Sequence, residues 1–87
     1  MGDIMNNYLL LLEKGIKHVL RGENFAKNKD KQSAYAEYKN AESAFAQSLV
    51  LASKANDTEV VDDLEGLLFF VTIEIDGYEE ELAGQMV

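Results

Sequence analysis

The chain contains a single histidine, His18, and no cysteine. One imidazole cannot by itself supply the nucleophile, base and orienting group of a hydrolytic triad. Without cysteine there is also no thiolate metal site, no thiol nucleophile and no disulfide. His18 stands among Lys14, Lys17 and Arg21, on the opposite side of a helix from Leu9. We therefore expect a solvent-exposed imidazole on a basic face, and phosphoryl transfer is the chemistry that such a group could carry.

The string His18-Val19-Leu20-Arg21-Gly22 resembles the core motif of the histidine phosphotransfer (HPt) domain. In that motif an exposed helical histidine is followed by an apolar residue, a basic residue and a glycine. The resemblance implies that His18 accepts the phosphoryl group, that Arg21 neutralises its charge, and that Gly22 leaves room for a docking partner. The other interpretation is an ordinary solvated histidine, so phosphotransfer through His18 is kept as an alternative function.

The charges are sorted along the chain, which has eight Lys and Arg and sixteen Asp and Glu. Every basic residue lies at or before Lys54, whereas ten carboxylates lie at or after Asp57. The run Glu79-Glu80-Glu81 points in successive directions around a helix, which indicates a solvated end rather than an acid/base pair. Calcium-loop spacing and a phosphate-binding glycine loop are both missing from the sequence. We therefore expect no enzymatic activity, no metal site and no cofactor.

The net charge of −8 is unfavourable for contact with nucleic acid or anionic lipid. The apolar run from Tyr8 to Leu12 is too short to cross a bilayer, so membrane insertion is not expected. A chain without cysteine suits a reducing compartment, and we expect it in the cytoplasm. These features favour a protein or peptide as the partner.

Hydrophobic periodicity predicts an all-α single domain, residues 1–87, with helices at roughly 3–26, 30–55 and 57–83. Short polar connections make neighbouring helices antiparallel, which gives an up-down-up three-helix bundle. The expected core stripe of the first helix is Met5, Leu9, Leu12, Ile16, Val19 and Leu20. That of the second is Ala34, Tyr38, Ala41, Phe45, Leu49 and Ala52, and that of the third is Val61, Leu64, Leu68, Val71, Ile75, Tyr78 and Leu82.

The third helix has a competing interpretation. Residues 69–75 are rich in aromatic and β-branched side chains, as in a strand. A lone strand would leave its backbone groups without partners, so helix is preferred. Asn56 is followed three positions later by Glu59, the spacing of a capping box, and we expect the helix to begin there.

Opposite the core stripe of the third helix lie three large apolar residues, Phe69, Phe70 and Ile73. They are flanked by carboxylates, among them Asp62 and Glu80. An exposed apolar patch of this kind usually marks a contact surface. Three possibilities are open: a partner segment with apolar and basic residues, burial by the first two helices, or a homodimer that pairs these side chains.

The first two helices resemble helical-hairpin families. Gly22, Phe25, Ala34, Tyr38 and Ala41 have the spacing of the tetratricopeptide repeat (TPR). The chain as a whole is more similar to the MIT (microtubule-interacting and trafficking) domain. That similarity rests on Val19-Leu20-Arg21 near the end of the first helix and on Ala34-x-x-x-Tyr38-Lys39-x-Ala41 in the second.

The MIT resemblance implies a non-catalytic adaptor that docks peptides of the membrane-remodelling ESCRT machinery in grooves beside its third helix. The expected ligand is a basic amphipathic peptide or helix, bound by a monomer or a homodimer. By position, the carboxylates Asp62, Asp63 and Glu65 would pair with basic residues of the peptide. The same analogy places Leu64 and Leu68 on the groove floor and Ala41, Phe45 or Ser48 on the opposing wall.

Overall fold

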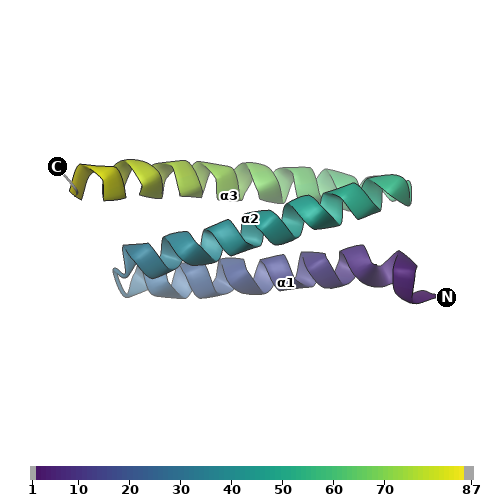
Figure 1. Ribbon diagram of the computed structural model, residues 1–87, viewed down its shortest axis with the longest axis horizontal. Helices are drawn as coiled ribbons and strands as arrows, with labels where there is room; N and C mark the ends of the chain where they lie inside the picture. The colour runs from purple at the N-terminus through teal and green to yellow at the C-terminus, as the bar shows by residue number, and fades with distance from the viewer. Residues whose placement is uncertain (1, 86–87) are drawn as a thin grey trace.

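The computed structural model describes the backbone of residues 2–85 and the side chains of residues 7–85. This part of the chain forms three α-helices, α1 (Gly2–Lys27), α2 (Lys31–Lys54) and α3 (Thr58–Gln85), and contains no strand (Figure 1). Each boundary lies within two residues of the predicted one. Residues 69–75 are helical throughout, so the strand interpretation is wrong.

The helices run up, down and up, and α2 is the element that the other two share (Figure 1). α1 packs against α2 and α2 packs against α3, whereas α1 and α3 touch only sparsely in the described part of the chain. The molecule is accordingly long and thin, with extents of 51 × 18 × 16 Å. The predicted all-α three-helix bundle is confirmed, in an open form.

α2 carries most of the core because it is covered from two sides. Its predicted stripe is confirmed: Tyr38 and Phe45 are buried together with the alanines between them, while Leu49 is half-buried. The alanines allow both neighbouring helices to approach closely. Ser48 is also fully buried, and its hydroxyl donates a hydrogen bond of 2.6 Å to the carbonyl oxygen of Tyr8.

The predicted core stripe of α1 is wrong in part. Leu9, Ile16 and Leu20 are 42, 40 and 60% exposed, and the side chain of Met5 lies outside the described residues. Among residues 7–27 of α1, the buried positions are instead Tyr8, Gly15 and Gly22.

The physical reason is that α1 meets α2 through its glycines. A methyl group added at Gly15 would overlap the ring of Phe45, and one added at Gly22 would lie 3.2 Å from Cε2 of Tyr38. The two aromatic rings of α2 therefore occupy space that side chains at these positions would fill. As a result Leu9, Ile16 and Leu20 lie beside the contact with α2 rather than in it. Leu12 and Val19, the other described members of the predicted stripe, are half-buried against the core.

The two connections between helices have the same backbone conformation. Lys29 and Asn56 adopt the left-handed conformation, with φ of 63° and 58°. In each turn the next amide bonds back to the preceding helix, from Asp30 to the Phe25 carbonyl (2.9 Å) and from Asp57 to the Ala52 carbonyl (3.1 Å). This is the Schellman arrangement that ends a helix.

Each turn then begins the next helix with an aspartate cap. Asp30 accepts a hydrogen bond from the Ser33 amide (3.1 Å), and Asp57 accepts one from the Val60 amide (3.3 Å). The cap of α3 is therefore Asp57, and the expected Asn56–Glu59 capping box is wrong by one residue. Asn56 instead supplies the left-handed residue that ends α2, a role for which asparagine is suited.

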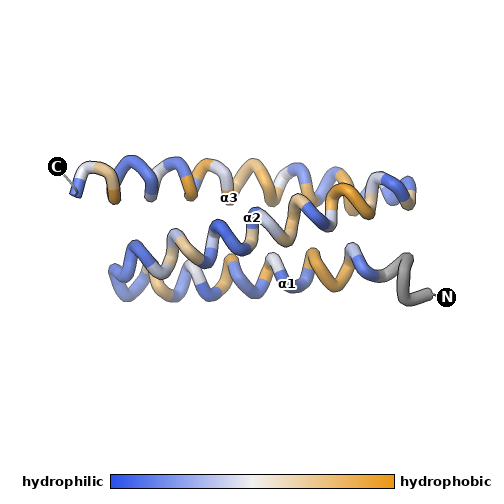
Figure 2. The backbone as a smooth tube through the Cα atoms, in the orientation of Figure 1, coloured by the Kyte–Doolittle hydropathy of each residue, from blue (hydrophilic) through white to orange (hydrophobic). Residues whose placement is uncertain are grey.

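The stripe predicted for α3 faces α2. Leu64, Val71 and Ile75 are buried, while the other members of that stripe, Val61, Leu68, Tyr78 and Leu82, are half-buried. Figure 2 shows hydrophobic residues recurring along α3 between hydrophilic ones, from its first turn to its last. α3 thus rests on α2 along one side and leaves the rest of its circumference uncovered.

Candidate docking groove

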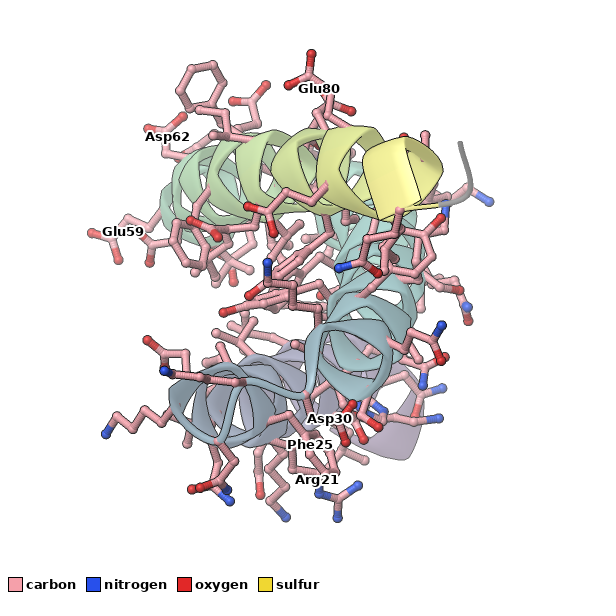
Figure 3. All side chains as sticks on the ribbon, turned by 90° about the vertical axis from the view of Figure 1, so that its left-hand side faces the viewer. Arg21, Phe25, Asp30, Glu59, Asp62 and Glu80 are labelled. Atoms are coloured by element: carbon pink, nitrogen blue, oxygen red, sulfur yellow. The ribbon has the colours of Figure 1, made fainter. Side chains whose placement is uncertain are left out.

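A groove runs between α1 and α3 on the side of the molecule that α2 does not fill. Its wall on α1 is Leu12 and Ile16. Its wall on α3 is Asp62, Asp63, Gly66 and Leu67. In the view along the helices in Figure 3, α1 and α3 form opposite edges of the molecule and are joined through α2 on one side. The groove exists because α1 turns its glycines, rather than its leucines, towards α2.

The groove combines apolar walls with negative charge. Ile16 is 40% exposed and Leu12 and Leu67 are half-buried, so apolar surface remains available to a ligand. Asp62 and Asp63 are exposed, and α3 contains no Lys or Arg that would neutralise them. Such a surface is complementary to a segment with apolar and basic side chains.

Gly66 gives the groove additional room. A Cβ placed at this position meets no atom within 4 Å, so internal packing does not require glycine here. A glycine inside a helix lowers stability by about 1 kcal/mol relative to alanine. Without a side chain at this position, the wall of the groove stays open beside Asp63 and Leu67.

Several residues predicted to bind a partner are in the core instead. Ala41, Phe45 and Leu64 are fully buried, with 0% exposure, so they offer no surface to a ligand. Leu68 is half-buried, and Ser48 is occupied by its bond to Tyr8. The groove that the analogy places between the second and third helices is thus closed by their own packing.

The predicted carboxylates separate into two groups. Asp62 and Asp63 line the groove between α1 and α3 on the side of Leu12 and Ile16, and Asp62 stands at its outer rim, since Figure 3 shows its side chain pointing away from α1. Glu65 is exposed and is not part of this lining. The structure therefore brings two of the three predicted carboxylates to one apolar site.

The residues opposite the core stripe are exposed, so their burial by the first two helices is excluded. Phe69 is 70%, Ile73 53% and Phe70 38% exposed. Phe70 is the least exposed because its ring lies edge-on to Tyr38, with ring centres 6.3 Å apart. Phe69 and Ile73 form a separate surface on the outer side of α3.

An aromatic cluster holds the second half of α3 on α2. Tyr38 stacks on Tyr78 with ring centres 5.8 Å apart, and burial raises the pKa of Tyr38 to about 12. Tyr35 donates a hydrogen bond of 2.9 Å to Glu79, which raises the pKa of the Tyr35 phenol. Lys31 forms an ion pair of 2.9 Å with Glu81. These contacts fix α3 without help from α1.

His18 is not the exposed group that was expected. Its side chain is 14% exposed, and its Nδ1 lies 2.7 Å from Oε1 of Glu37 on α2. The expectation of exposure is wrong because the helical-wheel position of His18 turns it towards the seam between α1 and α2, not away from the bundle. Phosphoryl transfer through His18 stays an untested alternative.

Four groove residues were missed from the sequence as ligand-binding positions, namely Leu12, Ile16, Gly66 and Leu67. Leu12 and Ile16 were assigned to the core, since an apolar stripe does not reveal which part of it a neighbour covers. Gly66 carried a usable signal, because a glycine inside a strongly periodic helix often has a packing or functional reason.

No protein-family model, curated protein or solved structure matches this chain. The resemblance to the MIT domain therefore stays a prediction. Within the described residues, no helix is both long and apolar enough to pass through a bilayer.

Proposed function

We propose that this protein is a non-catalytic interaction module that docks a basic amphipathic peptide or helix in the groove between α1 and α3. The observation that supports the proposal is the meeting of Leu12, Ile16 and Leu67 with Asp62 and Asp63 in one groove. The apolar walls would take Leu or Ile side chains of the ligand. The two carboxylates would attract Lys or Arg at its margin and set its register.

A ligand of this kind buries a modest area, so we expect micromolar affinity, about 8 kcal/mol of binding free energy. Weak binding suits a component that recruits its partner reversibly. The resemblance to the MIT family further supports an adaptor in membrane trafficking, at work in the cytoplasm.

Charge reversal in the groove tests the proposal. The ligand is a fluorescein-labelled helical peptide with Leu on one face and Lys on the opposite face, and binding is measured by fluorescence anisotropy. Replacing Asp62→Lys together with Asp63→Lys should weaken binding at least about tenfold, since two attractive contacts become repulsive. The matched control is Glu23→Lys with Glu42→Lys, which makes the same change of net charge outside the groove and should retain at least half of the affinity.

A second variant separates docking from general electrostatics. Gly66→Leu keeps the charge and fills the groove, and the space around Gly66 allows the fold to accept it. It should abolish peptide binding while circular dichroism shows unchanged or increased helicity. Full binding by Gly66→Leu, or an equal loss in the charge-matched control, would show that the peptide does not use this groove.

A further inference from the structure

The outer side of α3 carries an apolar patch that the groove does not use. Phe69 and Ile73 are its exposed apolar members. Asp76 and Glu80 follow on the same side of the helix, and together with Ile73 they line a shallow depression. The four residues are spaced i, i+4, i+7 and i+11, which places them on one face. We call Phe69, Ile73, Asp76 and Glu80 the acidic face.

The outer side of α1 repeats that spacing with the opposite charge. Leu10 is 63% exposed, and Lys14, Lys17 and Arg21 are exposed after it. They also stand at i, i+4, i+7 and i+11, and we call these four residues the basic face. In the parallel alignment that places Lys17 beside Asp76 and Arg21 beside Glu80, Leu10 falls beside Phe69. Lys14 then falls beside Ile73, where its aliphatic stem can cover the apolar side chain.

The two faces lie on opposite edges of the molecule. Figure 3 shows Glu80 and Asp62 at the α3 edge and Arg21 at the α1 edge, pointing away from each other. One copy therefore cannot bring its own faces together. A second copy presents a basic face to the first and leaves its own acidic face free.

We propose that the basic face of one copy docks on the acidic face of the next, so that the protein associates head to tail. Pairing of two acidic faces is unfavourable, because α3 carries nine carboxylates and no basic residue. A head-to-tail contact has no twofold symmetry and continues from copy to copy unless a rotation closes it into a ring. The net charge of −8 makes copies of the protein repel each other, so association is weak and depends on concentration.

Two variants, each defective in one face, test the direction of assembly. Phe69→Asp disables the acidic face, and Lys14→Glu with Arg21→Glu disables the basic face. These side chains are exposed, so the core is retained and circular dichroism should be unchanged. In sedimentation at millimolar concentration, the native chain should form a series of oligomers and each variant should remain monomeric. An equimolar mixture of the two variants should form dimers and nothing larger, because each dimer has two disabled outer faces.

The controls are Val50→Asp, an exposed apolar residue of α2, for the acidic face and Lys27→Glu with Lys29→Glu for the basic face, and both should associate like the native chain. Raising NaCl from roughly 50 to 500 mM should dissociate the oligomers, because salt screens exposed charges. A native chain that stays monomeric at millimolar concentration overturns the proposal. Dimers of the Lys14→Glu, Arg21→Glu variant that strengthen with salt would also overturn it, since they would show apolar pairing of two α3 helices. Peptide binding in the groove is measured at low micromolar concentration and does not depend on this result.

Discussion

Glycine has opposite roles at different positions of this chain. Gly15 and Gly22 are buried where the rings of Phe45 and Tyr38 press on the backbone of α1. Gly66 lies in open space at the groove. The same substitution should therefore change stability in opposite directions at the two kinds of site.

Gly15→Ala should destabilise the protein by about 1–3 kcal/mol, because the new methyl group overlaps the fully buried Phe45 ring and forces the two helices apart. Urea denaturation followed by circular dichroism measures the effect. Adding Phe45→Leu should recover part of the loss, because the two positions share one contact.

Gly66→Ala is the matched control and should stabilise the protein by about 1 kcal/mol through helix propensity alone. Equal effects of the two substitutions would contradict the packing described for Gly15.

The individual residues of the site were only partly predictable. The exposure of Asp62 and Asp63 follows from the helical period, but the groove that they line has α1, and not the expected second helix, as its other wall. Their binding of a partner stays a prediction. The analogy wrongly exposed Ala41, Phe45 and Leu64 to a ligand, because a family resemblance fixes sequence positions but not how closely two helices approach. The partner of His18 was missed for the same reason, as Glu37 belongs to another helix.

The three helices could be predicted closely, because each has a long apolar period and short polar connections separate them. Their ends depend on backbone conformation, which a periodic pattern does not report. Asn56 and Asp57 are both residue types that cap helices, and each has a different role here. Asn56 adopts the left-handed conformation that ends α2, and Asp57 caps the beginning of α3. In the other turn, Lys29 adopts the left-handed conformation and Asp30 caps the beginning of α2.

Lys29→Gly should stabilise the protein by about 1 kcal/mol, because a lysine in the left-handed region bears a steric cost that glycine avoids. Thermal unfolding followed by circular dichroism measures the change. Lys39→Gly, in the middle of α2, is the control and should lower stability by about 1 kcal/mol. A loss of stability in Lys29→Gly would mean that the turn does not hold the left-handed conformation.

The molecule as a whole is a layered stack in which α2 stands between two partners that hardly meet. Packing therefore joins helices that are neighbours in the sequence, an arrangement that favours fast folding. It also allows α3 to separate from α2 while the α1–α2 pair stays formed. The sequence did not predict this openness, because stripes alone do not distinguish a closed bundle from a stack.

Leu64→Ala tests whether α3 can separate from α2 while the α1–α2 pair stays formed. Leu64 is fully buried on α3. Truncating a buried leucine to alanine lowers the free energy of unfolding by about 2–5 kcal/mol, and we expect a loss in this range here. Native-state hydrogen exchange should accelerate strongly for the amides of α3 and only slightly for those of α1. A uniform acceleration along the chain would show that the three helices open as one unit.

The hydrogen bond from Tyr8 to Asp57 has a mechanical consequence. It joins the beginning of α1 to the residue that caps α3, across 2.8 Å, and it raises the pKa of the Tyr8 phenol. Since α1 and α3 otherwise touch little in the described residues, this bond ties the two helices together at the Tyr8 end of the groove. No other side-chain hydrogen bond joins them in that part of the chain, so a bulky side chain of a ligand should find most room at the end remote from Tyr8.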